Sequence, residues 1–268
     1  MQAVVLIPAF DRPEMVWVCL DHLAACPEAR EVEIRVCIDG RRGSAPLEEY
    51  YAVLDRFPRL AVGLMRTPSH TFSGNSYNVL NAYAEAYFDG FDWMYLVEDD
   101  VLVRPEFFTW HQHVHTCGQP AAASIGVSDP GHGAFASLGV CLPRSTVELV
   151  LPHVTSDYFA AMRDYCRWHF RKSPFDCEQD GLWARLLAGK RVAWAHPPVA
   201  SHVGWYGYHR LSQRRPEGTL QERYDDVRAV IANPRLLARE RGDHGDVSVA
   251  VLPNEGGFIL TTVPGGAV

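Results

Sequence analysis

Short apolar runs, rich in β-branched residues, alternate with helical patterns through the first hundred residues. The strand-like runs and the helical patterns between them are 3–7, 13–23, 32–38, 47–57, 60–65, 78–88 and 93–97. Such an alternation is typical of a mostly parallel sheet joined by right-handed crossover connections. We therefore predict an α/β fold with a mostly parallel central sheet flanked by helices. The 268 residues suffice for one large domain of this class or for two small ones.

Polar residues collect where four of these runs end. The four segments are 10–12, 39–41, 66–67 and 98–100. In parallel α/β sheets, ligands bind beyond the carboxyl ends of the strands, so we expect the four segments to meet on one rim. Neither G-x-G-x-x-G after the first strand nor G-x-x-x-x-G-K-[ST] occurs. The sequence therefore supports neither a Rossmann dinucleotide site nor a P-loop.

Three consecutive carboxylates, Glu98, Asp99 and Asp100, follow the fourth apolar run. A second short run, 101–103, comes next, and Pro105 stands where a helix would begin. Adjacent acids at the end of a buried strand repel one another and lose hydration, unless they face solvent or a cation neutralises them. Oxygen ligands of this kind suit Mg²⁺ or Mn²⁺ shared with substrate phosphates. An acidic turn that caps the next helix is the alternative, and this stretch alone leaves both open.

The second half of the chain predicts a smaller and more mixed region. Strands are expected at 121–127, 134–142 and 191–195, helices at 156–170 and 220–231, and a C-terminal hairpin from 247–252 and 258–263. Glu178 and Asp180 precede apolar positions with helical spacing, so they lie at the start of another helix. Capping of that helix is a sufficient reason for one acid at its start, but less so for Asp176, Glu178 and Asp180 together. The role of Asp39 also has two interpretations. It could contact a base or ribose, or it could act as a turn residue before Gly40.

These motifs, in their order, resemble the GT-A fold glycosyltransferases. The strand, Glu-Asp-Asp, strand and Pro-Glu-Phe-Phe series over 93–108 resembles the acidic metal motif of that family. It is closest to the form in N-acetylglucosaminyltransferases that start complex N-glycans, and the chain also resembles the family 2-like inverting transferases. Residues 4–13 look like the first nucleotide-binding strand, and 179–189 like the helix that bears the catalytic base. Residues 197–204 resemble the late histidine segment, so the match spans roughly 1–210.

The resemblance implies a Rossmann-like GT-A domain over 1–210. Residues 1–104 would form its nucleotide-sugar-binding half and 105–210 its acceptor-side half, with the helix and hairpin of 211–268 packed on the same domain. It implies transfer of a sugar from a nucleoside-diphosphate sugar, a UDP-sugar as first expectation, to a hydroxyl with inversion. A nucleoside diphosphate leaves as a concentrated charge, so Mn²⁺ or Mg²⁺ is the implied cofactor.

The resemblance also assigns roles to individual residues. Asp100 and His202 would bind the metal, and Trp205 and Tyr206 would contact the acceptor. Asp180 is the first choice for the base and Glu178 the second. Many relatives have adjacent Glu-Asp where this chain has Gln179 between its two acids, so a retaining mechanism stays open if neither is the base. The implied donor-binding residues are Pro8, Phe10, Arg12, Asp39, Arg66, Asn78, Glu98 and Asp99.

Two other functions fit a similar sheet: a nucleotidyltransferase, and a non-catalytic sugar- or nucleotide-binding protein. The segment 8–13 lacks the glycine- and arginine-rich phosphate loop of nucleotidyltransferases, and the intact acids count against a non-catalytic scaffold. The acceptor could be a glycan, a lipid-linked sugar, a small metabolite or a hydroxymethylated base in DNA. The net charge of −7 argues against DNA.

Bulk features indicate the compartment. No apolar run approaches the ~20 residues that span a bilayer, and no signal-peptide pattern is seen. The seven cysteines form no C-x-x-C pair, which favours reduced thiols over disulfides or a zinc cluster. We therefore expect a cytoplasmic protein.

Overall fold

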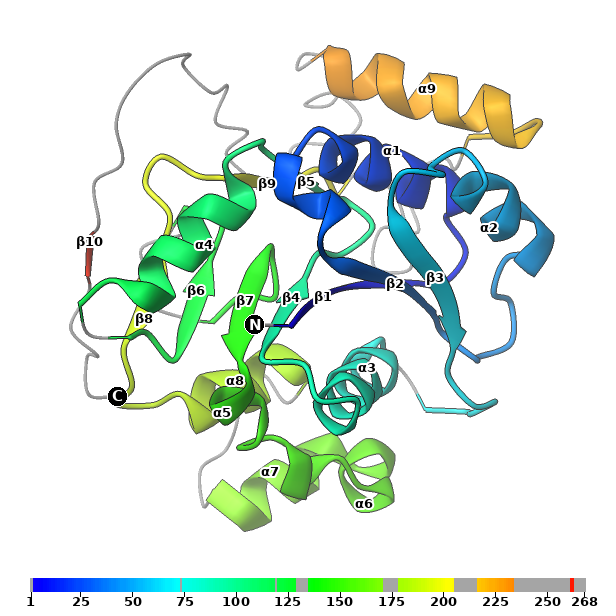
Figure 1. The fold of residues 1–268 in the computed structure, drawn as a ribbon. Helices are drawn as coiled ribbons and strands as arrows, with labels where there is room; N and C mark the ends of the chain where they lie inside the picture. Colours follow the sequence, from blue (N-terminus) through cyan, green and yellow to red (C-terminus); the bar gives the residue numbers. More distant parts are fainter. Residues whose placement is uncertain are drawn as a thin grey trace.

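The computed structural model describes residues 2–72, 74–118, 120–128, 135–170, 178–204, 216–233 and 261–262. Within these residues, a sheet of eight strands has the order β10-β8-β6-β7-β4-β1-β2-β3 (Figure 1). The strands are β1 (Ala3–Ala9), β2 (Glu33–Ile38), β3 (Ala61–Arg66), β4 (Trp93–Leu96), β6 (Ala123–Ile125), β7 (Val140–Pro143), β8 (Val192–Trp194) and β10 (Thr261–Thr262). The pairs β1–β2, β1–β4, β2–β3 and β6–β8 are parallel, whereas β7 pairs antiparallel with β4 and β6, and β10 with β8. The predicted mostly parallel α/β sheet is confirmed.

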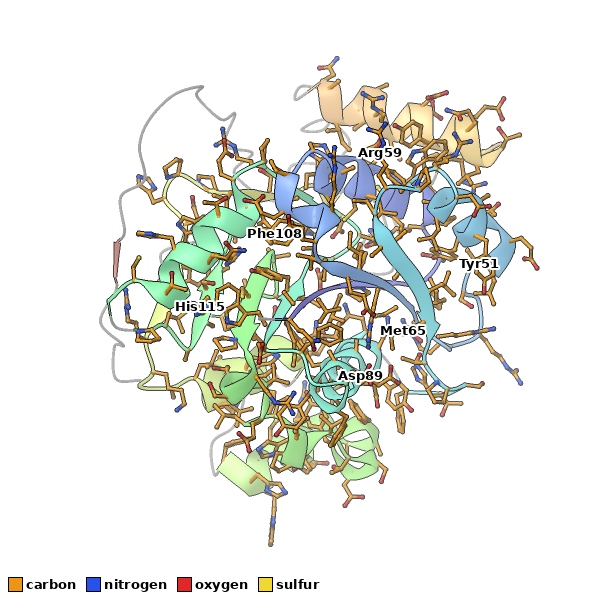
Figure 2. All side chains as sticks on the ribbon, viewed as in Figure 1. Tyr51, Arg59, Met65, Asp89, Phe108 and His115 are labelled. Carbon is orange, nitrogen blue, oxygen red and sulfur yellow. The ribbon has the colours of Figure 1, made fainter. Side chains whose placement is uncertain are left out.

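Two apolar cores lie on the two faces of this sheet. In β1, Val5 and Ile7 belong to one core while Val4 and Leu6 belong to the other, and all four are fully buried. This is why the strand is a continuous apolar run without polar alternation. Phe108, labelled in Figure 2, is fully buried in the first core.

The helices divide between the same two faces (Figure 1). The first core is covered by α1 (Pro13–Ala24), η1 (Pro27–Arg30), α2 (Leu47–Leu54), α4 (Phe107–Thr116) and α9 (Leu220–Ala232). The second is covered by α3 (Ser76–Phe88), α5 (Arg144–Val147), η2 (Leu151–His153), α6 (Ser156–Ala160), α7 (Met162–Phe170) and α8 (Gln179–Leu186). In the part of the chain that is described, no helix combines the length and the apolar character needed to cross a membrane.

A separate pair of short strands brings two distant segments together. Strand β5 (Val101–Val103) runs antiparallel to β9 (Ala200–His202), with Val101 opposite His202. The backbone N–H of Val203 donates a further hydrogen bond to the carbonyl of Asp100 at 2.8 Å. The late histidine is therefore placed beside the acidic segment by backbone pairing.

The structure differs from the sequence expectations at several element boundaries. The helix expected at 156–170 is two helices, α6 and α7, because the backbone leaves the helical region at Ala161 (φ −149°, ψ 55°). The strand expected at 134–142 begins only at Val140. The chain turns just before it at Gly139, whose φ is +63° and where an added Cβ would lie 2.8 Å from the Cβ of Ala200.

The region after residue 204 is described only in part. Helix α9 packs on α1, where the rings of Tyr224 and Trp17 stack with their centroids 3.8 Å apart. Arg223 also donates to Glu14 at 3.1 Å and to Glu49 at 2.6 Å. The first strand of the expected hairpin, 247–252, lies outside the described residues. In the second, Thr261 and Thr262 pair with β8.

Candidate functional site

A cavity of about 360 Å³ opens at the carboxyl ends of β1, β2 and β4. These strands are parallel neighbours, so the loops that follow them meet at one edge of the sheet. The N-termini of α3 and α8 and the end of β9 complete the wall. The lining residues are Pro8, Ala9, Phe10, Asp11, Arg12, Asp39, Arg41, Gly74, Asn75, Asn78, Glu98, Asp99, Asp100, Glu178, Gln179, Asp180, His202 and Gly204.

The three consecutive acids lie on this wall, and Arg12 lies across two of them. Its Nε donates to Oδ2 of Asp99 at 3.2 Å, its Nη2 to Oδ1 of Asp99, and its Nη1 to Oδ2 of Asp100 at 3.2 Å. Asp99 is only 3% exposed and Asp100 only 7%. One guanidinium therefore compensates two buried carboxylates. The third, Glu98, accepts a longer hydrogen bond from Nδ2 of Asn75 at 3.4 Å.

Burial and charge separate the pKa values of the three acids. Burial raises the pKa of Glu98 well above its usual range, and the negative charges of Asp100 and Asp180 raise it further. Burial also raises the pKa of Asp99 to about 7, although Arg12 opposes that shift. Burial acts in the same direction on Asp100, but Arg12 and His202 outweigh it, and its pKa is lowered. Asp100 is therefore the acid that stays ionised most readily.

His202 and Asp100 form the part of the site that fits a divalent ion. Nε2 of His202 lies 3.4 Å from Oδ2 of Asp100. Among the described residues, Oδ1 of Asp100 is buried and has no hydrogen-bond partner, although buried carboxylate oxygens are normally satisfied. Carboxylate oxygens with an imidazole nitrogen are ligands that Mn²⁺ accepts. Within the same residues, no three acidic, histidine or cysteine side chains already surround a point that could hold an ion.

The start of α8 supplies the second pair of acids. Glu178 is the N-cap residue and Asp180 lies in the first turn, as the sequence pattern predicts. The hydroxyl of Ser137 donates a hydrogen bond to Oδ1 of Asp180. Glu178 lies near Gly74, where an added Cβ would be 3.5 Å from Oε1 of Glu178.

The glutamine between these acids packs against α3. Gln179 is 5% exposed, its backbone N–H donates to the hydroxyl of Ser76 at 3.1 Å, and that hydroxyl donates to Oε1 of Gln179 at 2.7 Å. The residue that departs from the family's Glu-Asp pair therefore fixes the start of α8 against the start of α3. Its neighbours Glu178 and Asp180 remain on the cavity wall.

Asp39 follows β2, lines the cavity and is 1% exposed. It accepts hydrogen bonds from the backbone N–H of Arg41 at 2.9 Å and from Nε of Arg41 at 2.9 Å, and its Oδ1 lies 2.7 Å from Nε2 of His70. The guanidinium of Arg41 also lies over the ring of Phe10, 4.7 Å from its centroid. Asn78 donates to the carbonyl of Cys37 at 2.7 Å and so holds the end of β2.

The structure brings most of the residues singled out from the sequence into this one cavity. The exception among the described ones is Arg66, which is exposed at the end of β3 and does not belong to the lining residues. Thr67 is buried instead, and its hydroxyl accepts from the backbone N–H of Gly40 at 2.8 Å. The segments 10–12, 39–41 and 98–100 therefore meet at the cavity. The fourth segment, 66–67, does not line it but supports 39–41 through the hydrogen bond between Thr67 and Gly40. Trp205 and Tyr206 lie outside the described residues.

Sequence reasoning missed three residues that shape the site. Arg41 and His70 hold Asp39, and Ser137 holds Asp180. Arg41 belongs to a polar segment that was expected on the rim. Ser137 lies in a small, apolar stretch that predicts only a strand, so no local signal marks it.

Comparison with known proteins agrees with this fold. No protein-family model matches the sequence, and no curated protein matches it in sequence. Among solved structures, it is similar to the mannosyltransferase PcManGT from Pyrobaculum calidifontis, in complex with GDP-Man and Mn²⁺. That match has a TM-score of 0.53 and 14% identity, and covers 92% of this chain and 76% of that one.

Two further similarities have TM-scores below 0.5. The galactosyltransferase LgtC, in complex with donor and acceptor sugar analogues, gives 0.44 at 12% identity over 84% of this chain and 83% of that one. TarS from S. aureus gives 0.39 at 12% identity over 57% of this chain, and the chain spans about half (49%) of that TarS structure. The similarity to the mannosyltransferase, above 0.5, shows a shared fold. The chain therefore shares the fold of this mannosyltransferase structure, and the GT-A-like fold expected from the acidic motif is confirmed.

Proposed function

We propose that the protein is a metal-dependent glycosyltransferase. It moves a sugar from a nucleoside-diphosphate sugar to a hydroxyl acceptor with inversion at the anomeric carbon. The observation that carries the proposal is the charge of the cavity at the rim of a glycosyltransferase-type sheet. Its described lining holds two arginines against seven carboxylates, which are Asp11, Asp39, Glu98, Asp99, Asp100, Glu178 and Asp180.

This charge balance explains why a divalent ion belongs to the proposal. A diphosphate that enters a cavity rich in carboxylates meets like charge, unless a cation accompanies it. Asp100 and His202 would hold Mn²⁺ or Mg²⁺, because they lie together and Asp100 keeps a buried oxygen without a partner among the described residues. The ion would stabilise the negative charge of the departing nucleoside diphosphate. The Mn²⁺ and GDP-Man in the similar mannosyltransferase structure agree with this choice.

The donor would lie along the wall formed by the first two strands. Pro8, Phe10 and Asp39 line the cavity after these strands, where we place the base and ribose. A UDP-sugar remains our first choice of donor. Glu98 and Asp99 would contact the ribose or water bound to the metal, and Arg12 the phosphates. Asn78 would act indirectly, because its amide holds the end of β2.

The acids of α8 would act on the acceptor. Asp180 would take the proton of the acceptor hydroxyl while its oxygen attacks the anomeric carbon from the face opposite the diphosphate. The bond from that carbon to the diphosphate oxygen breaks, and its electron pair leaves with the nucleoside diphosphate. Ser137 supports the choice of Asp180, because its hydrogen bond holds the carboxylate at the cavity wall. Trp205 and Tyr206 would contact the acceptor, and the acceptor classes named above all stay within the proposal.

The proposal is tested by screening UDP-, GDP-, TDP- and CMP-sugars with the purified protein. Each donor is incubated with Mn²⁺ or with EDTA, and hydrolysis of the donor and the shift in melting temperature are measured. We expect one nucleoside-diphosphate sugar to stabilise the protein and to be hydrolysed slowly, with both effects lost in EDTA. If no donor gives a metal-dependent response, the proposed function is wrong.

A further inference from the structure

Arg12 contacts the carboxylate to which we assign the metal ion. Its guanidinium donates to both oxygens of Asp99 and to Oδ2 of Asp100. Oδ2 of Asp100 is also the oxygen nearest His202, at 3.4 Å. A cation of the chain itself therefore contacts the same carboxylate oxygen as the histidine to which we assign the metal.

This arrangement has two consequences for a divalent ion. The positive charge of Arg12 repels the ion, and its Nη1 uses an acceptor oxygen of the principal ligand. Arg12 is also held in this position, because without it the buried carboxylates of Asp99 and Asp100 would lose the guanidinium that contacts them both. The ion and the guanidinium therefore compete for one cluster of negative charge.

Arg12 can also reach a second partner. Its side chain lines the cavity and is 17% exposed, so the guanidinium borders the space in which the donor would lie. A planar guanidinium binds phosphate oxygens in pairs. A diphosphate in the cavity could therefore pair with Arg12 in place of the Asp99 and Asp100 carboxylates, which would then be available to the metal.

We propose that Arg12 is a built-in counter-cation of Asp99 and Asp100 that excludes the metal ion from the free protein and transfers to the diphosphate when the donor binds. The diphosphate half of this inference rests on the proposed function, whereas the competition with metal does not. The expected behaviour is positive coupling: nucleotide strengthens metal binding and metal strengthens nucleotide binding by the same factor. Coupling of this kind typically amounts to roughly 5- to 150-fold.

The two halves predict opposite changes in one variant. Arg12→Gln should bind Mn²⁺ more tightly than the wild type in the absence of nucleotide, by roughly fivefold or more. The same variant should bind UDP and GDP more weakly in the presence of Mn²⁺. An arginine that only contacts the donor would change the second affinity and leave the first unchanged.

The experiment is a calorimetric titration of the full-length protein with Mn²⁺ alone, and then with UDP or GDP at saturating Mn²⁺. The matched control is Arg41→Gln, which removes the other arginine of the described cavity lining. Because Arg41 forms an ion pair with Asp39, Arg41→Gln should keep the wild-type affinity for Mn²⁺. Equal or weaker Mn²⁺ binding by Arg12→Gln overturns the inference.

A second variant keeps the test valid if Arg12→Gln does not fold. Arg12→Lys keeps the charge, but its single ammonium cannot repeat the contacts of the guanidinium with both carboxylates. Its affinity for Mn²⁺ without nucleotide should lie above that of the wild type, and an unchanged affinity overturns the inference.

The outcome is separable from that of the proposed function, because the first titration contains no donor. Tighter Mn²⁺ binding by Arg12→Gln supports the competition even in a protein that hydrolyses no sugar nucleotide. If the wild type hydrolyses a sugar nucleotide only with metal, but Arg12→Gln and the wild type bind Mn²⁺ equally well, the proposed function stands and this inference alone is overturned.

Discussion

The hydroxyl of Ser137 donates a hydrogen bond to Oδ1 of Asp180, a residue 43 positions further along the chain. Ser137 is 2% exposed and lies just before β7, whereas Asp180 lies in the first turn of α8. A buried donor of this kind fixes the orientation of a carboxylate. It supports the proposal that Asp180 is the base.

The first prediction separates these two acids. Asp180→Asn should lower the rate of transfer by about 100- to 10,000-fold, because the acceptor hydroxyl loses its base. Donor binding should change little, as measured by the melting-temperature shift with UDP and Mn²⁺. Glu178→Gln is the comparison and should retain most of the turnover. The reverse result, with turnover lost only in Glu178→Gln, would assign the base to Glu178.

The second prediction concerns Ser137 itself, as a positioning residue. Ser137→Ala should lower kcat by roughly 10- to 100-fold, the loss expected for one hydrogen bond to a charged group. KM for the donor should stay near the wild-type value, because Ser137 is not among the residues that line the cavity in the described part of the chain. Ser137→Thr retains the hydroxyl and should recover part of kcat. Equal loss in both variants would point to packing and not to the hydrogen bond.

The third prediction concerns the metal. Asp100→Ala should abolish the Mn²⁺-dependent part of donor binding, because it removes the carboxylate whose buried Oδ1 has no hydrogen-bond partner among the described residues. EDTA should do the same to the wild type and have no further effect on the variant. Thermal melts with UDP, with and without Mn²⁺, measure both effects. Wild-type Mn²⁺ dependence in Asp100→Ala would remove this residue from the metal site.

The fourth prediction is a pH dependence of stability away from the cavity. His115 of α4 is 8% exposed, and its Nε2 lies 2.8 Å from the hydroxyl of Ser124. Nδ1 of His111 lies 2.6 Å from the same hydroxyl. Burial is the largest cause that lowers the pKa of His115 from 6.5 to about 4; backbone hydrogen bonds at Ala121 and Cys141 oppose the shift, and the nearby charge of Arg191 adds to it. Burial also lowers the pKa of His111 well below its usual range.

The sign of the effect follows from the proton balance. Between pH 6.5 and about 4 the unfolded chain binds a proton at His115 that the folded protein does not. The contribution to stability is therefore complete above pH 6.5 and is lost as the pH falls toward 4, by the order of 3 kcal/mol for a shift of this size. Urea unfolding at several pH values should show a shallower loss for His115→Asn than for the wild type. His113→Asn, at an exposed position of the same helix, should keep the wild-type slope.

The sequence was sufficient for the framework of the sheet because its signals are local. Apolar runs such as 3–7 and 93–97 have to be buried on both faces, and the helical patterns between them force parallel neighbours. The carboxyl ends of those strands then share one edge, which is why Asp39 and Asp100 could be placed on one rim in advance. These local patterns do not set every boundary. The helical pattern of 156–170 breaks at Ala161, and β7 starts only at Val140, after the close approach of Gly139 to the distant Ala200.

The site, like the sheet, has features that local sequence patterns determine and others that depend on the tertiary structure. The sequence by itself determined which acids stand at the end of β4 and at the start of α8, since each motif is a short run with a local pattern. The tertiary structure decided which partner each acid has: Arg12 lies 87 positions from Asp99, and Ser137 lies 43 from Asp180. It also left Arg66 outside the cavity and gave Gln179 a contact with Ser76. A hydrogen bond or an ion pair depends on positions in space, and for residues so far apart in sequence only the folded backbone sets those positions.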